Sequence, residues 1–501
     1  MLTYSDTVES ALLYILGVVI VLVGLMISIG LHEVGHLVPA KLFGVRVGQY
    51  MIGFGRTVFS KRVGETEYGL KMIPLGGYIS MAGMFPPERK GGKPRTASTG
   101  FFDTMVNDAR TAAHEGIPAG EEHRTFYRLP VLKRIVIMLG GPFMNLVLAF
   151  VFFGVVLVGF GLPQSSTTIG TVYECIVPAD STQTECTDVD PVAPAADAGL
   201  LPGDRIVAID GQAIEVYSDV SEIVTQAAGR ELEFEVIRDG REVTLAVTPL
   251  LTERPVYDDD LQPVRNPDGS IATQDVGFIG IGYAVQSVQQ PVTAVPGYVW
   301  DATERIGYSI ITLPARVYDL GVSTFGGTER DPEGIIGVVG IGRLAGEITS
   351  LETLPVADRA ASILGLLGGL NLALFLFNLI PLLPLDGGHV AGAIWEGVRR
   401  AFAKLFRRPD PGPVDVARLI PITMAVSGVL AVLTVFVIFS DIVNPIRTAA
   451  DKKLSARSLN RRCWVRAARG TPPLSVMEAP GASMASKVAW QVCRNSRIRA
   501  A

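Results

Sequence analysis

Four long runs without a charged residue constrain this chain of 501 residues more than any other feature. They cover residues 11–31, 135–162, 361–385 and 419–440. Because a helix needs roughly 20 apolar residues to cross a bilayer, each run is long enough to span a membrane. No basic segment precedes the first run and no small-residue cleavage site follows it, which argues against a secretory signal. The sequence therefore predicts a polytopic α-helical membrane protein with four transmembrane helices.

The charged residues make up only 19% of the chain, too few for a typical soluble domain, and they are unevenly distributed. Residues 163–357 contain 30 acidic residues, 10 Arg and no Lys. By contrast, residues 32–132 contain 13 basic and 9 acidic residues, and residues 386–418 contain 6 and 4. Because Lys and Arg concentrate in cytoplasmic loops, this pattern puts 32–132 and 386–418 inside and the acidic region outside. Both termini then face outward from a cell membrane.

Two of the four cysteines, Cys175 and Cys186, fall in the predicted outer region, where a disulfide can persist. Cys463 and Cys493 lie in the C-terminal tail. No Cys-x-x-Cys pair occurs, so a thiolate metal site is not indicated. The sequence leaves open whether Cys175 and Cys186 form a disulfide or are two unpaired small residues.

The first apolar run ends in His32-Glu33-Val34-Gly35-His36. Two His at i and i+4 lie on one face of a helix, so both imidazoles can bind one ion. Glu33 is the usual general base that takes a proton from water in zinc hydrolases with this motif. The alternative, a polar end to a membrane helix, would place three costly ionisable groups there without a function. The motif therefore predicts a zinc site.

A zinc enzyme of this kind needs a third protein ligand and keeps one position open. In the third run, Pro381 and Pro384 break the helix, and Asp386 follows at the end of the broken segment. A break at membrane depth is tolerated only where the backbone is buried in protein or lines a cavity. His389 is the alternative ligand, and Asp386 alone could be a turn residue before two glycines. Together with the His pair, Asp386 is the better candidate.

The motifs together resemble the site-2 protease family of intramembrane zinc metalloproteases. They are His-Glu-x-x-His at 32–36, Gly76-Gly77-Tyr78, Gly141-Pro142-Phe143-Met144-Asn145, and Asn-x-x-Pro-x-x-x-Leu-Asp-Gly from Asn378, and the resemblance covers about residues 10–445. With a single PDZ-like domain, the chain is most similar to bacterial regulator-of-sigma-E proteases of the actinobacterial Rip type. This resemblance implies cleavage of transmembrane substrates, with anti-sigma factors expected, after a first cut on their outer side.

By the same resemblance, His32, His36 and Asp386 would be zinc(II) ligands and Glu33 the catalytic base. Asn378 would hold substrate backbone or the developing oxyanion, a role that typically contributes a few kcal/mol. An interhelical hydrogen bond is the alternative role for Asn378. The family's zinc lies towards the cytoplasmic face, in agreement with the distribution of charge.

Residues 44–81 alternate apolar and polar side chains between turn glycines, which predicts a β-hairpin region on the cytoplasmic side. The family has a membrane-associated β-loop at this place. An exposed strand edge there could pair with unwound substrate, whereas the alternative is a covered structural hairpin.

An extracytoplasmic α+β domain is expected at residues 168–250, because the stretch 195–211 resembles the core signature of a PDZ domain. Its Leu-Pro-Gly-Asp segment predicts a tight turn, and Asp210-Gly211 predicts a hairpin. The insertion near 175–190 falls close to the expected peptide-binding edge. The sequence therefore leaves open whether the domain binds peptide termini or acts mainly as a size filter.

The other expected segments follow from these assignments. They are a first transmembrane helix at 8–36, a cytoplasmic loop at 82–132, a second transmembrane helix at 133–162, an extracytoplasmic amphipathic region at 251–357, a third transmembrane segment at 361–389 and a fourth helix at 419–440. Within 251–357, residues 291–320 and 335–346 are candidate amphipathic helices on the membrane surface, or part of a small core. The tail 447–501, with 12 basic and 2 acidic residues, is expected to be disordered and without a nucleic-acid partner.

Three functions are compatible with these residues. The first is an intramembrane zinc endopeptidase that acts on single-pass membrane proteins within the lipid bilayer. The second is a catalytically silent scaffold that presents a PDZ-like module, and the third is a metal transporter, since intramembrane His and Asp also line ion paths. Glu33 favours the protease, because neither a scaffold nor a transporter needs a catalytic base. The sequence does not indicate an oligomeric state.

Overall fold

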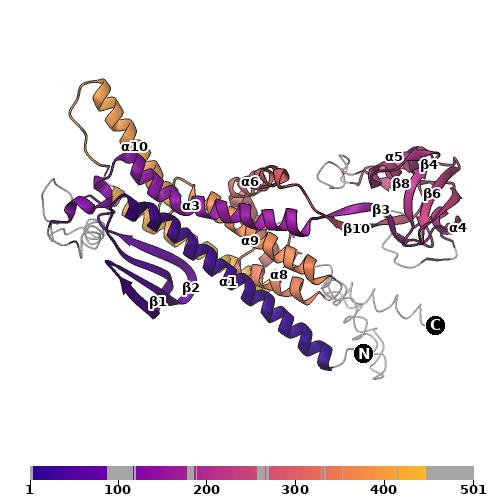
Figure 1. Cartoon of the computed structure of the whole chain (residues 1–501), viewed down its shortest axis with the longest axis horizontal. Coiled ribbons are helices and arrows are strands. Elements are labelled where there is room, and N and C mark those ends of the chain that lie inside the picture. Colours follow the sequence, from indigo (N-terminus) through magenta and orange to yellow (C-terminus); the bar gives the residue numbers. More distant parts are fainter. Residues whose placement is uncertain are drawn as a thin grey trace, which may run out of the picture. The chain divides into compact units, whose positions relative to one another are not determined.

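The computed structural model describes residues 4–446 apart from 87–116, 118–119, 178–185, 188, 257–263, 265, 267–269, 329, 332–333, 352–353 and 415. Much of the expected cytoplasmic loop at 82–132, the basic tail and its two cysteines therefore lie outside the described residues. Contacts divide the chain into two units (Figure 1). We call Met1–Phe152 with Tyr298–Ala501 the membrane unit, and Phe153–Gly297 the β unit.

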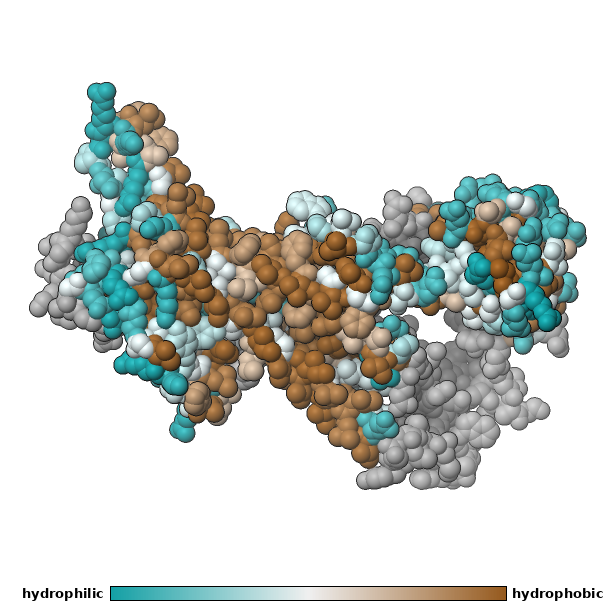
Figure 2. Space-filling model, in the orientation of Figure 1, coloured by the Kyte–Doolittle hydropathy of each residue, from teal (hydrophilic) through white to brown (hydrophobic). Residues whose placement is uncertain are grey.

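Among the described residues, four helices are long and apolar enough to cross a membrane. They are α1 (Tyr4–Leu42), α3 (Val131–Gly154) with the π-helical turn Val155–Phe160 that continues it, α9 (Val356–Asn378) and α11 (Ile420–Val443). Large apolar side chains are exposed along them, and Figure 2 shows this apolar surface along α1. A surface of this kind is unfavourable in water but suits contact with lipid. The chain is thus a polytopic membrane protein.

Helices α1 and α3 approach each other through glycine. A Cβ atom added at Gly35 would collide with the carbonyl oxygen of Gly140, and one added at Gly140 would collide with that of Gly35. Small residues allow this close backbone approach between membrane helices. As a result, the His-Glu-x-x-His segment of α1 lies directly against the first half of α3.

Strands β1 (Val47–Val63) and β2 (Thr66–Met81) form an antiparallel sheet beside α1 (Figure 1). Both strands bend, so residues 49–52 pair with 67–70 on one side and with 77–80 on the other. The hydroxyl of Tyr50 donates to the carbonyl oxygen of Gly30 at 2.7 Å, which anchors the sheet to α1 just before His32. The predicted β-hairpin region thus contains a sheet that is attached at the candidate metal site.

Helix α8 (Val338–Ser350) packs along the N-terminal half of α1. The Thr349 hydroxyl is 2.8 Å from the Leu13 carbonyl oxygen, and Gly346 leaves room for the Tyr14 ring. At the other end of α8, Asp441 of α11 accepts a hydrogen bond from the Gly340 amide at 2.8 Å.

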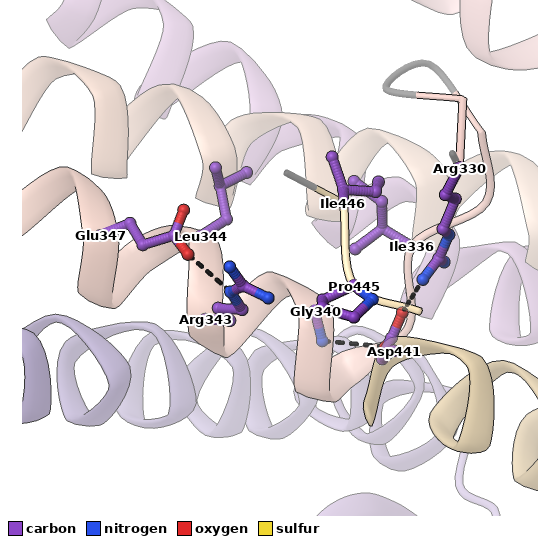
Figure 3. A pocket seen from close by; sticks show the side chains of 9 residues that line it. All are labelled: Arg330, Ile336, Gly340, Arg343, Leu344, Glu347, Asp441, Pro445 and Ile446. Carbon is purple, nitrogen blue, oxygen red and sulfur yellow. Dashed lines mark hydrogen bonds and ion pairs between the residues drawn. The ribbon is translucent and has the colours of Figure 1, made fainter. Parts of the chain in front are cut away.

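Figure 3 shows that Asp441 also meets Arg330, whose Nη1 lies 2.9 Å from Oδ1, beside a pocket bordered by α8 and the end of α11. Both side chains of this ion pair are almost fully buried. A buried charge is tolerated when it is paired and hydrogen-bonded, so Asp441 joins α11, α8 and the segment before α8.

The other elements of the membrane unit are shorter. They are α6 (Val295–Ile311, whose first residues belong to the β unit), α7 (Leu313–Gly326), α10 (Asp386–Leu405) and the 3₁₀ turns Glu122–Arg124, Phe126–Arg128 and Val416–Leu419. The two segments predicted as amphipathic helices contain α6 and the greater parts of α7 and α8. Trp300, Tyr308 and Tyr318 on α6 and α7 are exposed, while Thr324 of α7 bonds to Ser440 of α11 at 3.0 Å.

The β unit is built on an antiparallel sheet with the strand order β10-β3-β4-β6-β7. Its elements are β3 (Leu162–Val172), α4 (Pro194–Asp197), β4 (Arg205–Ile209), β5 (Gln212–Ala213), α5 (Tyr217–Gln226), β6 (Leu232–Arg238), β7 (Arg241–Val247), β8 (Leu250–Pro255), β9 (Thr273–Phe278), β10 (Ile281–Val288) and the 3₁₀ turn Val292–Ala294. Alternate residues of β6, namely Leu232, Phe234 and Val236, are fully buried in its core. Because alternate side chains of a strand share one face, the inward face of β6 contributes these residues to the core of this unit.

The β unit continues beyond residue 250, where the sequence predicted an amphipathic region. Strand β9 pairs with β8, and β10 pairs with β3. Ile281 and Tyr283, two residues apart on β10, pack against the core. Both strands are short, and their period of two is weak in the sequence. The place of β10 in the sheet depends on its pairing with β3, more than 100 residues earlier.

Cys175 and Cys186 form a disulfide, with Cα atoms 5.9 Å apart, in the segment between β3 and α4. This resolves the alternative that the sequence left open. Cys175 also pairs through its backbone with Val192, so the start and the end of this segment lie side by side.

The buried carboxyl of Asp204 should make the stability of the β unit fall at low pH. It is buried and accepts two hydrogen bonds from Arg238, at 2.6 and 2.8 Å, which lower its pKa. The contribution of this carboxylate to the free energy of unfolding is therefore complete above the unfolded-state pKa of about 4. It is lost as the pH falls through the lower folded-state pKa. Asp204→Asn should reduce the free energy of unfolding at pH 7 by about 1–3 kcal/mol and weaken the acid dependence. Hydrogen exchange of the β6 amides in the full chain, corrected for intrinsic rates, measures the free energy of unfolding and its dependence on pH. If Asp204→Asn left this pH dependence unchanged, the role of Asp204 would be contradicted.

Candidate metal centre

Three side chains from distant parts of the chain converge at one point: His32 and His36 of α1 and Asp386 of α10. The two Nε2 atoms are 3.2 Å apart, and Asp386 Oδ2 lies 3.3 Å from His32 Nε2 and 3.4 Å from His36 Nε2. Ligand atoms bound tetrahedrally to zinc at 2.0–2.1 Å are about 3.3–3.4 Å apart. The observed separations therefore fit one face of a zinc coordination tetrahedron.

The helix of α1 explains the position of both imidazoles. His32 and His36 are one turn apart, and α1 continues unbroken past them to Leu42. Their side chains are 13% and 4% exposed, so the pair is largely enclosed by protein. Gly141 of α3 makes this possible, because a Cβ atom there would collide with the His36 ring.

The break between α9 and α10 brings Asp386 to the His pair. Helix α9 ends at Asn378, and Asp386 is the first residue of α10, where a negative charge is favoured by the helix dipole. The turn between them is tight: a Cβ atom at Gly387 would collide with the carbonyl oxygen of Ile380. The two prolines and the two glycines of this segment thus position the carboxylate.

Contacts on the far side of the imidazoles come from α3. The Ile137 carbonyl oxygen lies 2.8 Å from His36 Nδ1, and the Asn145 amide lies 3.1 Å from His32 Nδ1. Because a carbonyl oxygen can only accept, a neutral His36 carries its proton on Nδ1 and presents an Nε2 lone pair to the cluster. This is the form of histidine that binds a metal, so the donor set suits a zinc ion.

Glu33 lies next to the ligands but is not one of them. It is 8% exposed. Gly77 of β2 packs against it, since a Cβ atom at Gly77 would be 3.0 Å from Glu33 Cγ. The sheet of β1 and β2 therefore covers the side chain predicted to be the base.

Two further residues singled out in the sequence lie outside the ligand cluster. Asn378, at the end of α9, is half-buried, and its side chain has no hydrogen-bond partner among the residues that the structure describes. His389, the alternative third ligand, lies in the first turn of α10 and does not join the three ligand atoms that lie within 4.8 Å of one another.

Sequence reasoning did not assign a role to the surroundings of the ligands. It found the Gly-x-x-x-Asn stretch of α3 as a family motif without its contact to His32. It also missed the carbonyl of Ile137 and the packing of Gly77 on Glu33. The available signal was a polar residue, Asn145, within an apolar run, where polar side chains usually have partners.

A His-Glu-x-x-His helix of membrane-spanning length, completed by a distant carboxylate, defines the class of membrane-bound zinc metalloproteases. The sequence profile of peptidase family M50 matches residues 20–407. The chain belongs to this family, the site-2 protease family that its motifs resemble, and zinc is its cofactor.

Named relatives agree with this assignment. The chain is 30% identical over 448 residues to the zinc metalloprotease Rip1 of Mycobacterium tuberculosis, covering 87% of this chain and 99% of the relative. It is 32% identical over 447 residues to Rip1 of Mycolicibacterium smegmatis, covering 86% and 98%. It is also 31% identical over 397 residues to the metalloprotease MmpA of Caulobacter vibrioides, covering 77% and 88%.

Substitutions of the candidate ligands should separate Asp386 from His389. We expect His32→Ala, His36→Ala and Asp386→Ala to lose most of the roughly one zinc ion per chain, because each removes one of three protein ligands. His389→Ala should retain it. Elemental analysis of the purified full chain gives the zinc content. Retention by Asp386→Ala together with loss by His389→Ala would move the third-ligand role to His389.

Proposed function

We propose that this protein is an intramembrane protease that hydrolyses peptide bonds within single-pass membrane proteins already shortened by a first extracytoplasmic cut. The observation that carries the proposal is the convergence of Asp386 with His32 and His36, which lie beside Glu33 on a helix long enough to span a membrane. By resemblance to regulator-of-sigma-E proteases, anti-sigma factors are the substrates we propose.

In this proposal His32, His36 and Asp386 hold zinc, which when bound polarises the scissile carbonyl and lowers the pKa of water. Glu33 accepts the proton of the attacking water at its carboxylate and passes it to the leaving nitrogen. Its enclosure by Gly77 and α1 keeps the carboxylate next to the ligands. Asn378, without a partner among the described residues, donates its amide N–H to the carbonyl oxygen as negative charge develops there.

A substrate helix must unwind before its carbonyl can be attacked, because helical carbonyls are already hydrogen-bonded. The sheet of β1 and β2 supports a way to hold the unwound strand. Residues 77–80 form one edge of this sheet, and Gly77 at that edge packs against Glu33. We therefore propose that the substrate adds a strand to this edge.

We further propose that the β unit is PDZ-like and extracytoplasmic and that the metal centre lies towards the cytoplasmic side of a cell membrane. The disulfide between Cys175 and Cys186 supports an oxidising compartment for this unit. The excess of Lys and Arg over acidic residues in 32–132 and 386–418 supports the same orientation.

Glu33→Gln tests the catalytic role without removing a ligand. The variant should keep its zinc, while cleavage of a substrate stump falls by about 10²–10⁴-fold, because the amide cannot accept the proton. Zinc analysis and a cleavage assay on the same purified sample check both expectations, with His32→Ala as the control that loses both. Undiminished proteolysis by Glu33→Gln would refute the mechanism.

The pairing of β3 with β10 allows a sharp test of the filter hypothesis. Val172 and Ile281 are partners at the ends of these strands, so replacing 173–280 by Asn-Gly should leave a two-stranded ribbon with a tight turn. If the β unit excludes bulky ectodomains, this variant should cleave full-length substrate in cells that lack the first protease. It should also cleave the shortened stump at a rate close to that of the intact chain.

The same variant distinguishes a filter from a recruiter. Loss of stump cleavage with no gain on full-length substrate would mean that the β unit recruits substrate. Cys175→Ser with Cys186→Ser in the otherwise intact chain serves as the control, because the deletion removes this disulfide as well.

A further inference from the structure

A side chain to which neither the motifs nor the comparisons assign a role contacts His32. Asn145 of α3 is 1% exposed, and its amide lies 3.1 Å from His32 Nδ1. This nitrogen faces away from the ligand cluster, whereas Nε2 faces His36 and Asp386. Asn145 therefore contacts the ring on the side opposite to the metal position.

The protonation of the ring decides what Asn145 must supply. A ligand Nε2 needs its lone pair, so a neutral His32 carries its proton on Nδ1 and requires an acceptor there. With the Asn145 Nδ2 toward the ring, two donors would face each other. In that orientation Oδ1 is buried without a hydrogen-bond partner among the described residues. Asn145 Oδ1 is therefore free to serve as the acceptor that the ring requires.

We infer that Asn145 is a positioning residue whose Oδ1 accepts the Nδ1–H of His32. A half-turn of the amide exchanges its oxygen and nitrogen and provides this acceptor. The bond fixes the tautomer and the rotation of the ring, as the Ile137 carbonyl does for His36. This inference rests on the proposed role of His32 as a zinc ligand. Removing such an outer partner typically weakens metal binding by about 10–100-fold.

The packing of α3 explains why it can orient both rings. Gly35 and Gly140 allow α1 and α3 to touch at the backbone, beside the two His. Near the start of α3, Arg134 Nη2 lies 2.5 Å from Glu396 Oε1 of α10, and Glu396 is fully buried. Helix α3 is therefore attached both to the helix of the His pair and to the helix that begins with Asp386.

The test compares two substitutions at Asn145 in the purified full chain, with zinc affinity measured by competition against a chelator. Asn145→Leu removes the acceptor and should weaken zinc binding by about 10–100-fold. Asn145→Asp keeps an acceptor at the same position and should bind zinc within a few-fold of the unmodified chain.

Asn371→Leu is the matched control. Asn371 of α9 is as buried as Asn145, and its Nδ2 bonds to Ser28 Oγ of α1 at 2.9 Å without contact to a His nitrogen. Its replacement should lower the thermal stability comparably to Asn145→Leu but leave zinc affinity unchanged. The cobalt-substituted proteins add a spectroscopic readout, since a displaced His32 changes the visible absorption of Asn145→Leu and not of Asn371→Leu.

The outcomes separate this inference from the proposed function. If the unmodified chain and His32→Ala bind zinc equally, His32 is not a ligand and the proposed function fails. If His32→Ala loses zinc while Asn145→Leu retains full affinity, the inference about Asn145 alone is wrong. Equal losses in Asn145→Leu and Asn145→Asp would mean that the amide acts as a donor, which also overturns it.

Discussion

The structure depends on bringing two imidazoles and two carboxyl groups together inside helices that otherwise face lipid. Each of these groups is costly in an apolar environment unless it is bonded to protein or metal. The cost is met by close backbone packing rather than by bulky polar networks. Gly35, Gly140 and Gly141 let α3 contact α1, so that a backbone carbonyl and one amide reach the imidazoles. The ligands, their partners and the glycines therefore form one unit.

Bringing the candidate third ligand, Asp386, to the His pair imposes a second requirement. A continuous α9 could not end beside α1 and also start a new helix with a carboxylate turned towards the His pair. The segment from Asn378 to Gly388 solves this by closing a tight turn, in which Gly387 packs against the carbonyls of Leu379 and Ile380. A polar residue thus lies on each side of the break, Asn378 before it and Asp386 after it. This arrangement is compatible with one group binding metal and the other binding substrate.

The sequence predicts the parts of the fold that local patterns encode. The four apolar runs, the sheet at 44–81 and the His pair follow from length, period and spacing within a few turns. The third ligand required the family resemblance or the argument from a broken helix. Contacts such as Arg134 with Glu396, 262 residues apart, and Asn145 with His32, 113 residues apart, have no local signal. Strand β10 was missed for the same reason, because its partner β3 lies more than 100 residues earlier.

The geometry of the three candidate ligands also connects helices. Two Nε2 lone pairs and a carboxylate oxygen within 3.2–3.4 Å of one another repel unless a cation lies between them. A zinc ion held by His32, His36 and Asp386 would replace this repulsion and join α1 to α10, so its binding free energy would also stabilise the fold. Helix α10 is held to α3 by the pair of Glu396 and Arg134, and α3 is held to α1 by glycine packing. With a metal held at this site, the ion pair and the glycine contact would complete a ring of three helices, and a change at any one link would alter the other two.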